Sequence, residues 1–201
     1  MRQKHPRVPT AAYVNSSAAV KAESDACCTA ANAEEIVESL GSDTVILLQD
    51  VYLAQNVAAQ TRVKITAWAG HCEVHERFTG AQVRALRSDY PGVAILAHPE
   101  SRPEVIAEAG YTGSTADMSN SVGRGEPARV VLLSVCSMAD NVSVHYPSAG
   151  FVRPCNLWPH MRHITLANIR TALEEMRHEM LIGPAIAARA RQSVERMLAV
   201  R

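Results

Sequence analysis

The fold of this chain is decided by the stretch Val63-Lys64-Ile65-Thr66-Ala67-Trp68-Ala69-Gly70-His71-Cys72-Glu73-Val74-His75-Glu76-Arg77-Phe78. Its first half predicts a strand, and the residues that follow it, 79–89, have helical spacing and a threonine cap. Cys72 is therefore expected on the turn where a strand ends, which is where α/β folds place their sites. Here a thiol, two imidazoles and two carboxylates lie within six residues, a set that suits metal binding or nucleophilic chemistry but also a solvated loop.

Short apolar segments alternate with amphipathic ones along most of the chain. Strands are expected at residues 10–14, 25–28, 45–48, 63–67, 93–97, 111, 129–133 and 150–152. Helices are expected at residues 17–23, 31–40, 51–60, 79–89, 103–108, 115–122, 138–145, 165–178 and 184–200. This alternation predicts an α/β protein with parallel sheets covered by helices in three layers.

The sequence also repeats itself every 85 or 86 residues. Residues at or just after the ends of corresponding predicted strands recur at this spacing. The pairs are Tyr13 and His98, Leu48 and Leu133, and Cys72 and Trp158. Such agreement predicts two copies of one βαβαβα unit, residues 1–72 and 73–158. Residues 159–201 hold two helices without a strand between them. We expect them to complete a third copy that begins outside this chain, and to have no sheet of their own to pack on.

Composition narrows the class of function. Lys and Arg together number 20, as do Asp and Glu, so no basic stripe for a nucleic-acid backbone is expected. No apolar run approaches the roughly 20 residues that span a bilayer. The five cysteines are odd in number and form no Cys-x-x-Cys pair, which fits a reducing compartment. We therefore expect a cytoplasmic protein that acts on small molecules, with Cys27, Cys28 and Cys136 as small apolar core residues.

Five blocks of sequence carry a resemblance to a known family. They are residues 13–22, 70–79, 98–100, 113–115 and 154–166. At these blocks the chain resembles quinolinate synthase, the quinolinate synthetase A family of NAD biosynthesis, and lacks that family's N-terminal unit. The resemblance implies three homologous α/β units in a pseudo-threefold arrangement. About two of them, with the C-terminal helices that would complete the first, are expected in this chain.

The resemblance also implies a cofactor and a reaction. The cofactor is a [4Fe-4S] cluster held by three cysteines, one from each unit, with one iron open to the substrate. The reaction condenses iminosuccinate with dihydroxyacetone phosphate, with loss of phosphate and water, to give quinolinate. L-aspartate oxidase is then the expected metabolic supplier of iminosuccinate, and neither nucleic acid nor membrane is an expected partner.

Site residues follow from matching the blocks position by position. Condensation, enolisation and dehydration need acid/base groups, and the resemblance implies Tyr13, His98 and Glu100 for these roles. The substrate contacts that it implies are Tyr13, Val14, Asn15, His98, Pro99, Glu100 and Thr115. Cys72 is the implied metal ligand. His71 and His75 are expected in a solvated loop or in a hydrogen bond behind the site.

Several positions depart from the family pattern. Trp158 stands directly before Pro-His-Met, where the third cluster cysteine is expected, and an indole does not ligate iron. Cys155, three residues earlier, reaches a cluster only if its loop rearranges. Ala30 removes a hydroxyl from a substrate contact, and Val135 replaces an acidic residue. Of three cluster ligands, Cys72 alone is retained.

Three hypotheses therefore stay open. In the first, the chain is an enzyme whose site is completed by a further unit. In the second, it is a truncated, inactive remnant of the family without a bound cluster. In the third, Cys72, His71 and His75 bind zinc, although their spacing is not that of a standard zinc site.

Overall fold

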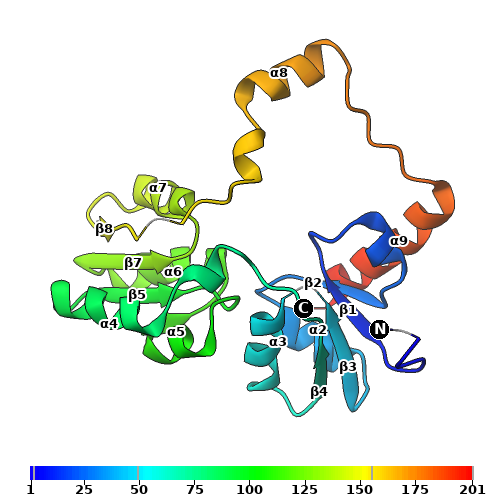
Figure 1. The fold of residues 1–201 in the computed structure, drawn as a ribbon, viewed down its shortest axis with the longest axis horizontal. Helices are drawn as coiled ribbons and strands as arrows, with labels where there is room; N and C mark the ends of the chain where they lie inside the picture. Colours follow the sequence, from blue (N-terminus) through cyan, green and yellow to red (C-terminus); the bar gives the residue numbers. More distant parts are fainter. Residues whose placement is uncertain (2, 49, 155, 201) are drawn as a thin grey trace.

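The computed structural model describes residues 1, 3–48, 50–154 and 156–200. Within them, strands form two four-stranded sheets that lie beside each other (Figure 1). The first sheet has the order β2-β1-β3-β4 and contains β1 (Thr10–Tyr13), β2 (Ala26–Cys28), β3 (Thr44–Leu48) and β4 (Lys64–Ala67). The second has the order β6-β5-β7-β8 and contains β5 (Ala94–Ala97), β6 (Tyr111–Thr112), β7 (Arg129–Leu133) and β8 (Gly150–Val152).

All strand pairs in both sheets are parallel, which confirms the predicted fold class. Each sheet has a fourth strand beyond the three of a βαβαβα unit. Corresponding strands begin at Thr10 and Ala94, Ala26 and Tyr111, Thr44 and Arg129, and Lys64 and Gly150, an offset of 84 to 86 residues. The structure thus repeats with the period of the sequence. The unit boundaries at residues 72 and 158 and the pseudo-threefold arrangement stay predictions.

Helices connect the strands of each sheet. In the first sheet these are α1 (Ala18–Ala22), α2 (Ala33–Ser39) and α3 (Val51–Ala58). In the second they are α5 (Pro103–Glu108), α6 (Thr115–Gly125) and α7 (Cys136–His145), with η1 (His75–Arg77) and α4 (Gly80–Asp89) leading into β5. Thr79 begins α4 and Ser114 begins α6 with capping boxes, in which side chain and backbone satisfy each other's hydrogen bonds.

Helices cover both faces of the second sheet. Successive strand residues point to opposite faces, so Val131 and Leu133 pack toward Val83 of α4, whereas Val130 and Leu132 pack toward Met118 of α6. In the first sheet, α2 and α3 cover the corresponding face and bury a cluster that also includes strand residues of β1 and β3. The second sheet is therefore covered on both faces and the first on one, and the carboxyl-terminal ends of both sheets are free to form a site.

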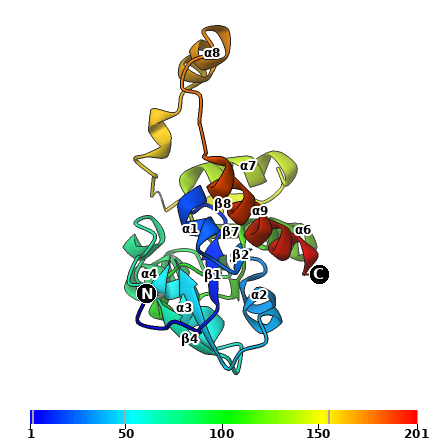
Figure 2. The same ribbon diagram turned by 90° about the vertical axis from the view of Figure 1, so that its right-hand side faces the viewer.

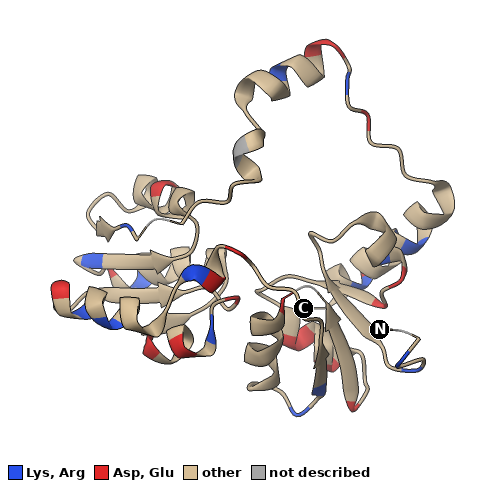
Figure 3. Ribbon diagram, in the orientation of Figure 1, with Lys and Arg blue, Asp and Glu red and all other residues tan. Residues whose placement is uncertain are grey.

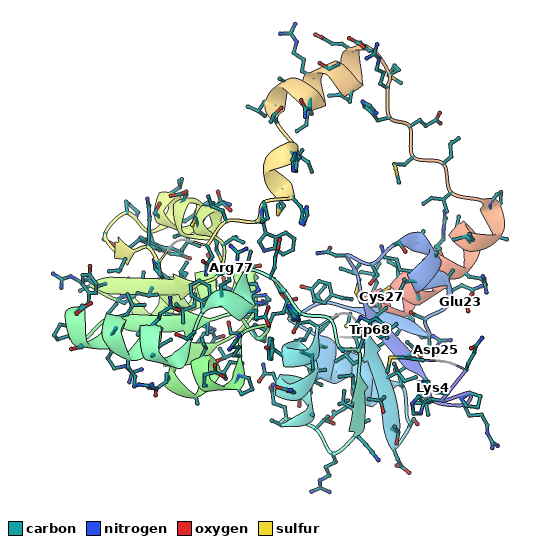
Figure 4. The ribbon with its side chains drawn as sticks, viewed as in Figure 1. Lys4, Glu23, Asp25, Cys27, Trp68 and Arg77 are labelled. Carbon is teal, nitrogen blue, oxygen red and sulfur yellow. The ribbon has the colours of Figure 1, made fainter. Side chains whose placement is uncertain are left out.

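The C-terminal segment contains η2 (Met161–His163), α8 (Leu166–Glu174) and α9 (Pro184–Ala199). Helix α9 packs against α1 and β2, where Ser193 Oγ lies 3.4 Å from Cys27 Sγ (Figure 4). The expectation that neither helix has a sheet to pack on is therefore wrong for α9. The side of α9 that faces the sheet buries Ala190, Ser193 and Met197. Strand β2 is the edge strand of the first sheet, so α9 can pack against it. By contrast α8 has no buried residue and extends away from both sheets (Figure 2).

Charged residues of both signs are interspersed over the two sheets and their helices (Figure 3). None of the helices in the described part of the chain combines the length and the apolarity that crossing a bilayer requires.

Candidate functional site

The carboxyl-terminal ends of the strands in both sheets face one shared cavity of about 530 Å³. Ligands of parallel α/β sheets bind at this edge. The polar groups on its wall include Tyr13, Asn15, Asp50, His71, Cys72, His75, His98, Glu100, Thr115 and Ser134. Trp158 and Val135 add apolar surface.

Equivalent positions of the two repeats meet at this cavity. The equivalent pairs on its wall are Tyr13 and His98, Asn15 and Glu100, and Cys72 and Trp158. The repeat therefore brings together residues that are far apart in the sequence, and it puts Trp158 on the wall at the position that corresponds to Cys72.

Asp50 holds the loop that carries Cys72. One carboxylate oxygen of Asp50 accepts the backbone N–H of Leu53 at 2.7 Å and caps α3, and the other accepts the backbone N–H of Cys72 at 2.7 Å. Burial raises the pKa of Asp50 to about 6. Because the carboxylate serves a helix end and a loop at once, it fixes Cys72 relative to the first sheet.

His75 lies at the centre of the site. Its Nδ1 is 3.1 Å from Cys72 Sγ and 3.0 Å from Glu100 Oε2, and its Nε2 is 3.1 Å from Ser134 Oγ. Burial by itself lowers the pKa of His75, but the hydrogen bonds to Cys72 and Glu100 outweigh it and raise the pKa to about 9. Its two neighbours therefore favour the protonated form of His75.

The two histidines near Cys72 each match one of the two environments expected of them, His71 an exposed loop and His75 a hydrogen bond to the implied metal ligand Cys72. His71 is exposed, and its Nε2 lies 2.7 Å from Glu76 Oε2. His75 is buried, because η1 turns its ring away from solvent and toward the second sheet. As a result the proposed zinc trio of Cys72, His71 and His75 does not form in the described structure.

His98 and Glu100 follow β5 and complete the titratable cluster. The ring of His98 stacks on that of His75 with centroids 4.3 Å apart, and burial together with this neighbouring cation lowers the pKa of His98 to about 4. The backbone N–H of Glu100 donates to His98 Nδ1 at 3.3 Å, so the neutral ring carries its proton on Nε2. Burial raises the pKa of Glu100, but the hydrogen bonds from His75 and Cys72 and the coulombic interactions with His98 and His75 together outweigh it, and the net pKa is lowered. The site thus holds one cationic imidazole, one neutral imidazole and one carboxylate.

Tyr13, Asn15 and Thr115 supply neutral polar groups on the wall. Burial, followed by the negative charge of Glu100, raises the pKa of Tyr13 to about 12, so its phenol stays protonated and can donate a hydrogen bond. Asn15 lies in the turn after β1, and Thr115 is the first residue of α6. Amide and hydroxyl groups at strand ends suit carboxylate and carbonyl oxygens of a ligand.

Two of the expected substrate contacts lie elsewhere. The side chain of Val14 packs against the core cluster of the first sheet. Pro99 lines a neighbouring cavity of about 350 Å³ together with Ala30. Both residues lie in turns that follow a strand, closed by the hydrogen bonds from Ser16 N–H to the Tyr13 carbonyl and from Ser101 N–H to the His98 carbonyl.

The described residues do not supply the ligands of a four-iron cluster. Such a cluster with one open iron needs three thiolates, and Cys72 is the one cysteine among the described residues that line the cavity. Trp158 occupies the wall where a second thiolate is expected. Cys155, the candidate substitute ligand, lies outside the described residues.

The remaining described cysteines lie away from the cavity. Cys27 and Cys28 are buried in the first sheet, as predicted. The interpretation of Cys136 as an apolar core residue is wrong, since it is only partly buried and its Sγ donates to the backbone oxygen of Asn156 at 3.3 Å.

Sequence reasoning missed three residues of the site: Asp50, Ser134 and the role of His75. An aspartate directly before a helical run is a signal for a cap, but nothing local indicates that its second oxygen binds Cys72. A spacing of three between Cys72 and His75 is a signal that both lie on one face of a helical turn. Ser134 follows a predicted strand end, which by itself marks no function.

A partly exposed thiol, two buried imidazoles and a buried carboxylate at the ends of parallel strands are typical of an α/β protein of the enzyme class. Comparison with known sequences then gives the family, because the family model "Quinolinate synthetase A protein" matches residues 1–199. The chain belongs to this family.

Individual relatives agree with that assignment. The chain is 64% identical over 200 residues to quinolinate synthase 1 of Mesorhizobium japonicum, and the match covers 100% of this chain and 62% of the relative. It is 60% identical over 200 residues to quinolinate synthase of Agrobacterium fabrum, covering 58% of the relative, and 56% identical to that of Xylella fastidiosa, covering 59%. The chain thus spans about 60% of the length of these relatives.

Proposed function

We propose that the cavity binds the two substrates of quinolinate formation, iminosuccinate and dihydroxyacetone phosphate, and carries the proton transfers of their condensation. The observation that supports this most is the meeting of Tyr13, Asn15, His98 and Glu100 on one wall. These are positions at which the resemblance to quinolinate synthase implies substrate contacts. The proposed setting is the cytoplasm, with L-aspartate oxidase as the supplier of iminosuccinate.

The protonation states of the titratable residues suggest a role for each of them in the reaction. Condensation begins with removal of a proton from a carbon beside a carbonyl, and Glu100 is the carboxylate that accepts it. The Nε2–H of neutral His98 and the phenol of Tyr13 donate hydrogen bonds to substrate oxygens. Cationic His75 holds the proton that a leaving hydroxyl needs to depart as water. Preorganised donors of this kind commonly contribute several kcal/mol to such reactions.

Substrate binding and complete turnover are separate questions for this chain. The family's cluster does not fit the described residues, since they offer one thiolate, and no step is assigned to it. The second candidate function, a family remnant that makes no quinolinate, is favoured by Trp158 at the position equivalent to Cys72. We therefore propose that the chain retains the binding and proton-transfer residues and does not turn over alone.

The experiment that tests the proposal is calorimetric titration. Two ligands are titrated: dihydroxyacetone phosphate, and oxaloacetate as the keto analogue of iminosuccinate. The proteins are the wild-type chain, the variants Tyr13→Phe and Glu100→Gln, and the control Glu104→Gln. Glu104 is a half-exposed glutamate on α5 outside the cavity. We expect binding to weaken about tenfold in Tyr13→Phe, which is the loss of one hydrogen bond worth roughly 1 to 1.5 kcal/mol, and to be unchanged in Glu104→Gln. Equal binding by all four proteins, or binding by none of them, contradicts the proposal.

A further inference from the structure

The geometry of Cys72, His75 and Glu100 points to a metal-bound state of the chain that is an alternative to the proton transfers proposed above, because a metal ion on His75 Nδ1 displaces the proton that lies between His75 and Glu100. One atom from each side chain, Sγ, a ring nitrogen and a carboxylate oxygen, lies within 4.8 Å of the other two. They come from three different segments: the loop after β4, η1 and the loop after β5. Such convergence of unlike donors on one point is what a metal ion requires.

The three side chains are close enough to share one ligand. His75 Nδ1 lies 3.1 Å from Cys72 Sγ and 3.0 Å from Glu100 Oε2. A divalent cation in the same place is attracted by a thiolate, a carboxylate and an imidazole lone pair at once. His75 is 5% and Glu100 is 8% exposed, and buried charged groups of this kind are usually paired or coordinate a metal.

The surrounding residues hold the donors in the orientation of metal ligands. Ser134 Oγ lies 3.1 Å from His75 Nε2 and thereby fixes the ring so that Nδ1 points at the other two donors. Asp50 accepts the Cys72 backbone N–H at 2.7 Å. In metal sites, the ring nitrogen of a ligating histidine that does not bind the metal usually makes a hydrogen bond to a neighbouring group.

We propose that Cys72, His75 and Glu100 bind one divalent transition-metal ion of the zinc class, in place of a four-iron cluster. One thiolate, one imidazole and one carboxylate are borderline-soft ligands, which favour Zn²⁺, Co²⁺ or Fe²⁺ over Mg²⁺ or Ca²⁺. Three protein ligands leave a fourth position, and partly exposed Cys72 borders the cavity there. That position is where catalytic zinc sites keep a water.

The test uses Co²⁺ as the probe, because thiolate coordination gives Co²⁺ an absorption band that the other ligands do not. The full chain, freed of metal with a chelator and kept reduced without oxygen, is titrated with Co²⁺ and then with Zn²⁺. We expect one Co²⁺ per chain with a thiolate charge-transfer band, and displacement by one equivalent of Zn²⁺.

Variants assign the ligands. We expect Cys72→Ser to abolish the thiolate band, and His75→Gln and Glu100→Gln to weaken Co²⁺ binding by about tenfold or more. The matched controls Cys136→Ser and His71→Gln keep both the band and the affinity. Far-ultraviolet circular dichroism of each variant without metal separates loss of a ligand from loss of fold. If Glu100→Gln is unfolded, Glu100→Asp replaces it, and we expect it to retain the band with weaker binding.

Three results overturn the proposal. The first is a thiolate band that persists in Cys72→Ser, and the second is the absence of Co²⁺ binding by the folded wild-type chain. The third is uptake of acid-labile sulfide with several irons per chain after reconstitution with iron and sulfide, because a cluster then occupies the site. None of these readouts involves quinolinate, dihydroxyacetone phosphate or oxaloacetate.

Discussion

At the scale of single residues, Asp50 joins two parts of the site through one carboxylate. We expect Asp50→Ala to lower the free energy of unfolding by about 1 to 3 kcal/mol, since it removes a helix cap and leaves the Cys72 amide without its acceptor. Asp50→Asn keeps one acceptor and is expected to lose less. Urea unfolding measures both, with Ser17→Ala, which removes the exposed cap of α1, as the control. Equal losses in Asp50→Ala and Ser17→Ala would contradict the double role.

The thiols are expected to differ in reactivity. Burial raises the pKa of Cys28 to about 12, and neither Cys27 nor Cys28 is accessible in the folded chain. Cys72 is partly exposed at the cavity. An alkylating reagent on the folded, metal-free protein is therefore expected to label Cys72 well before Cys27 or Cys28, as followed by peptide mass spectrometry. Equal labelling rates at Cys28 and Cys72 would show that the first sheet is open in solution.

At the scale of elements, the docking of α9 on the first sheet is the point at which expectation and structure differ. We expect Met197→Ala to lower the free energy of unfolding by about 2 kcal/mol, because Met197 is buried against β2. Leu198 is the matched control, since it is adjacent on the same helix and 71% exposed. Leu198→Ala is expected to change stability by less than about 0.5 kcal/mol. If both substitutions have the same effect, α9 is not docked as the structure has it.

Most elements were predictable because their signals are local. Three helices begin where the sequence predicts them. Helices α4 and α6 begin after the N-caps Thr79 and Ser114, and α5 begins at Pro103, whose ring fixes φ at a helical value. The partners of the elements were not predictable in the same way. Nothing local in α9 says that it covers Cys27, and nothing in the loop after β4 says that His75 will meet Glu100, 25 residues away. Such contacts depend on how the two sheets are arranged relative to each other. The sequence repeat predicted that the two units have the same fold, but it did not predict this arrangement.

At the scale of the whole molecule, apolar surface remains uncovered. A groove on the first sheet is lined by apolar side chains that include Val20, Ile46 and Trp68, and α8 exposes Leu166 and Leu173. In the second sheet the equivalents of Val20 and Ile46, Val105 and Val131, are buried in the cluster that Phe78 and Val83 complete. We therefore expect the chain to self-associate.

Light scattering coupled to size-exclusion chromatography measures this self-association. The mean mass is expected to rise with protein concentration, and to rise less in the variant Leu166→Glu/Leu173→Glu. The control Arg170→Glu changes charge on the same helix without removing apolar surface. A constant monomer mass of the wild-type chain over a hundredfold range of concentration would contradict the expectation.

We propose that this chain keeps the substrate-binding and proton-transfer residues of its family, whereas its described residues bring one thiolate to the cavity. The most direct measurement is an anaerobic assay of quinolinate formation from iminosuccinate and dihydroxyacetone phosphate after reconstitution with iron and sulfide. The wild-type chain and Trp158→Cys are each assayed alone and with the part of the Mesorhizobium japonicum relative that this chain does not cover. We expect product only when Trp158→Cys is combined with that part, whereas quinolinate made by the unmodified chain alone would contradict the claim.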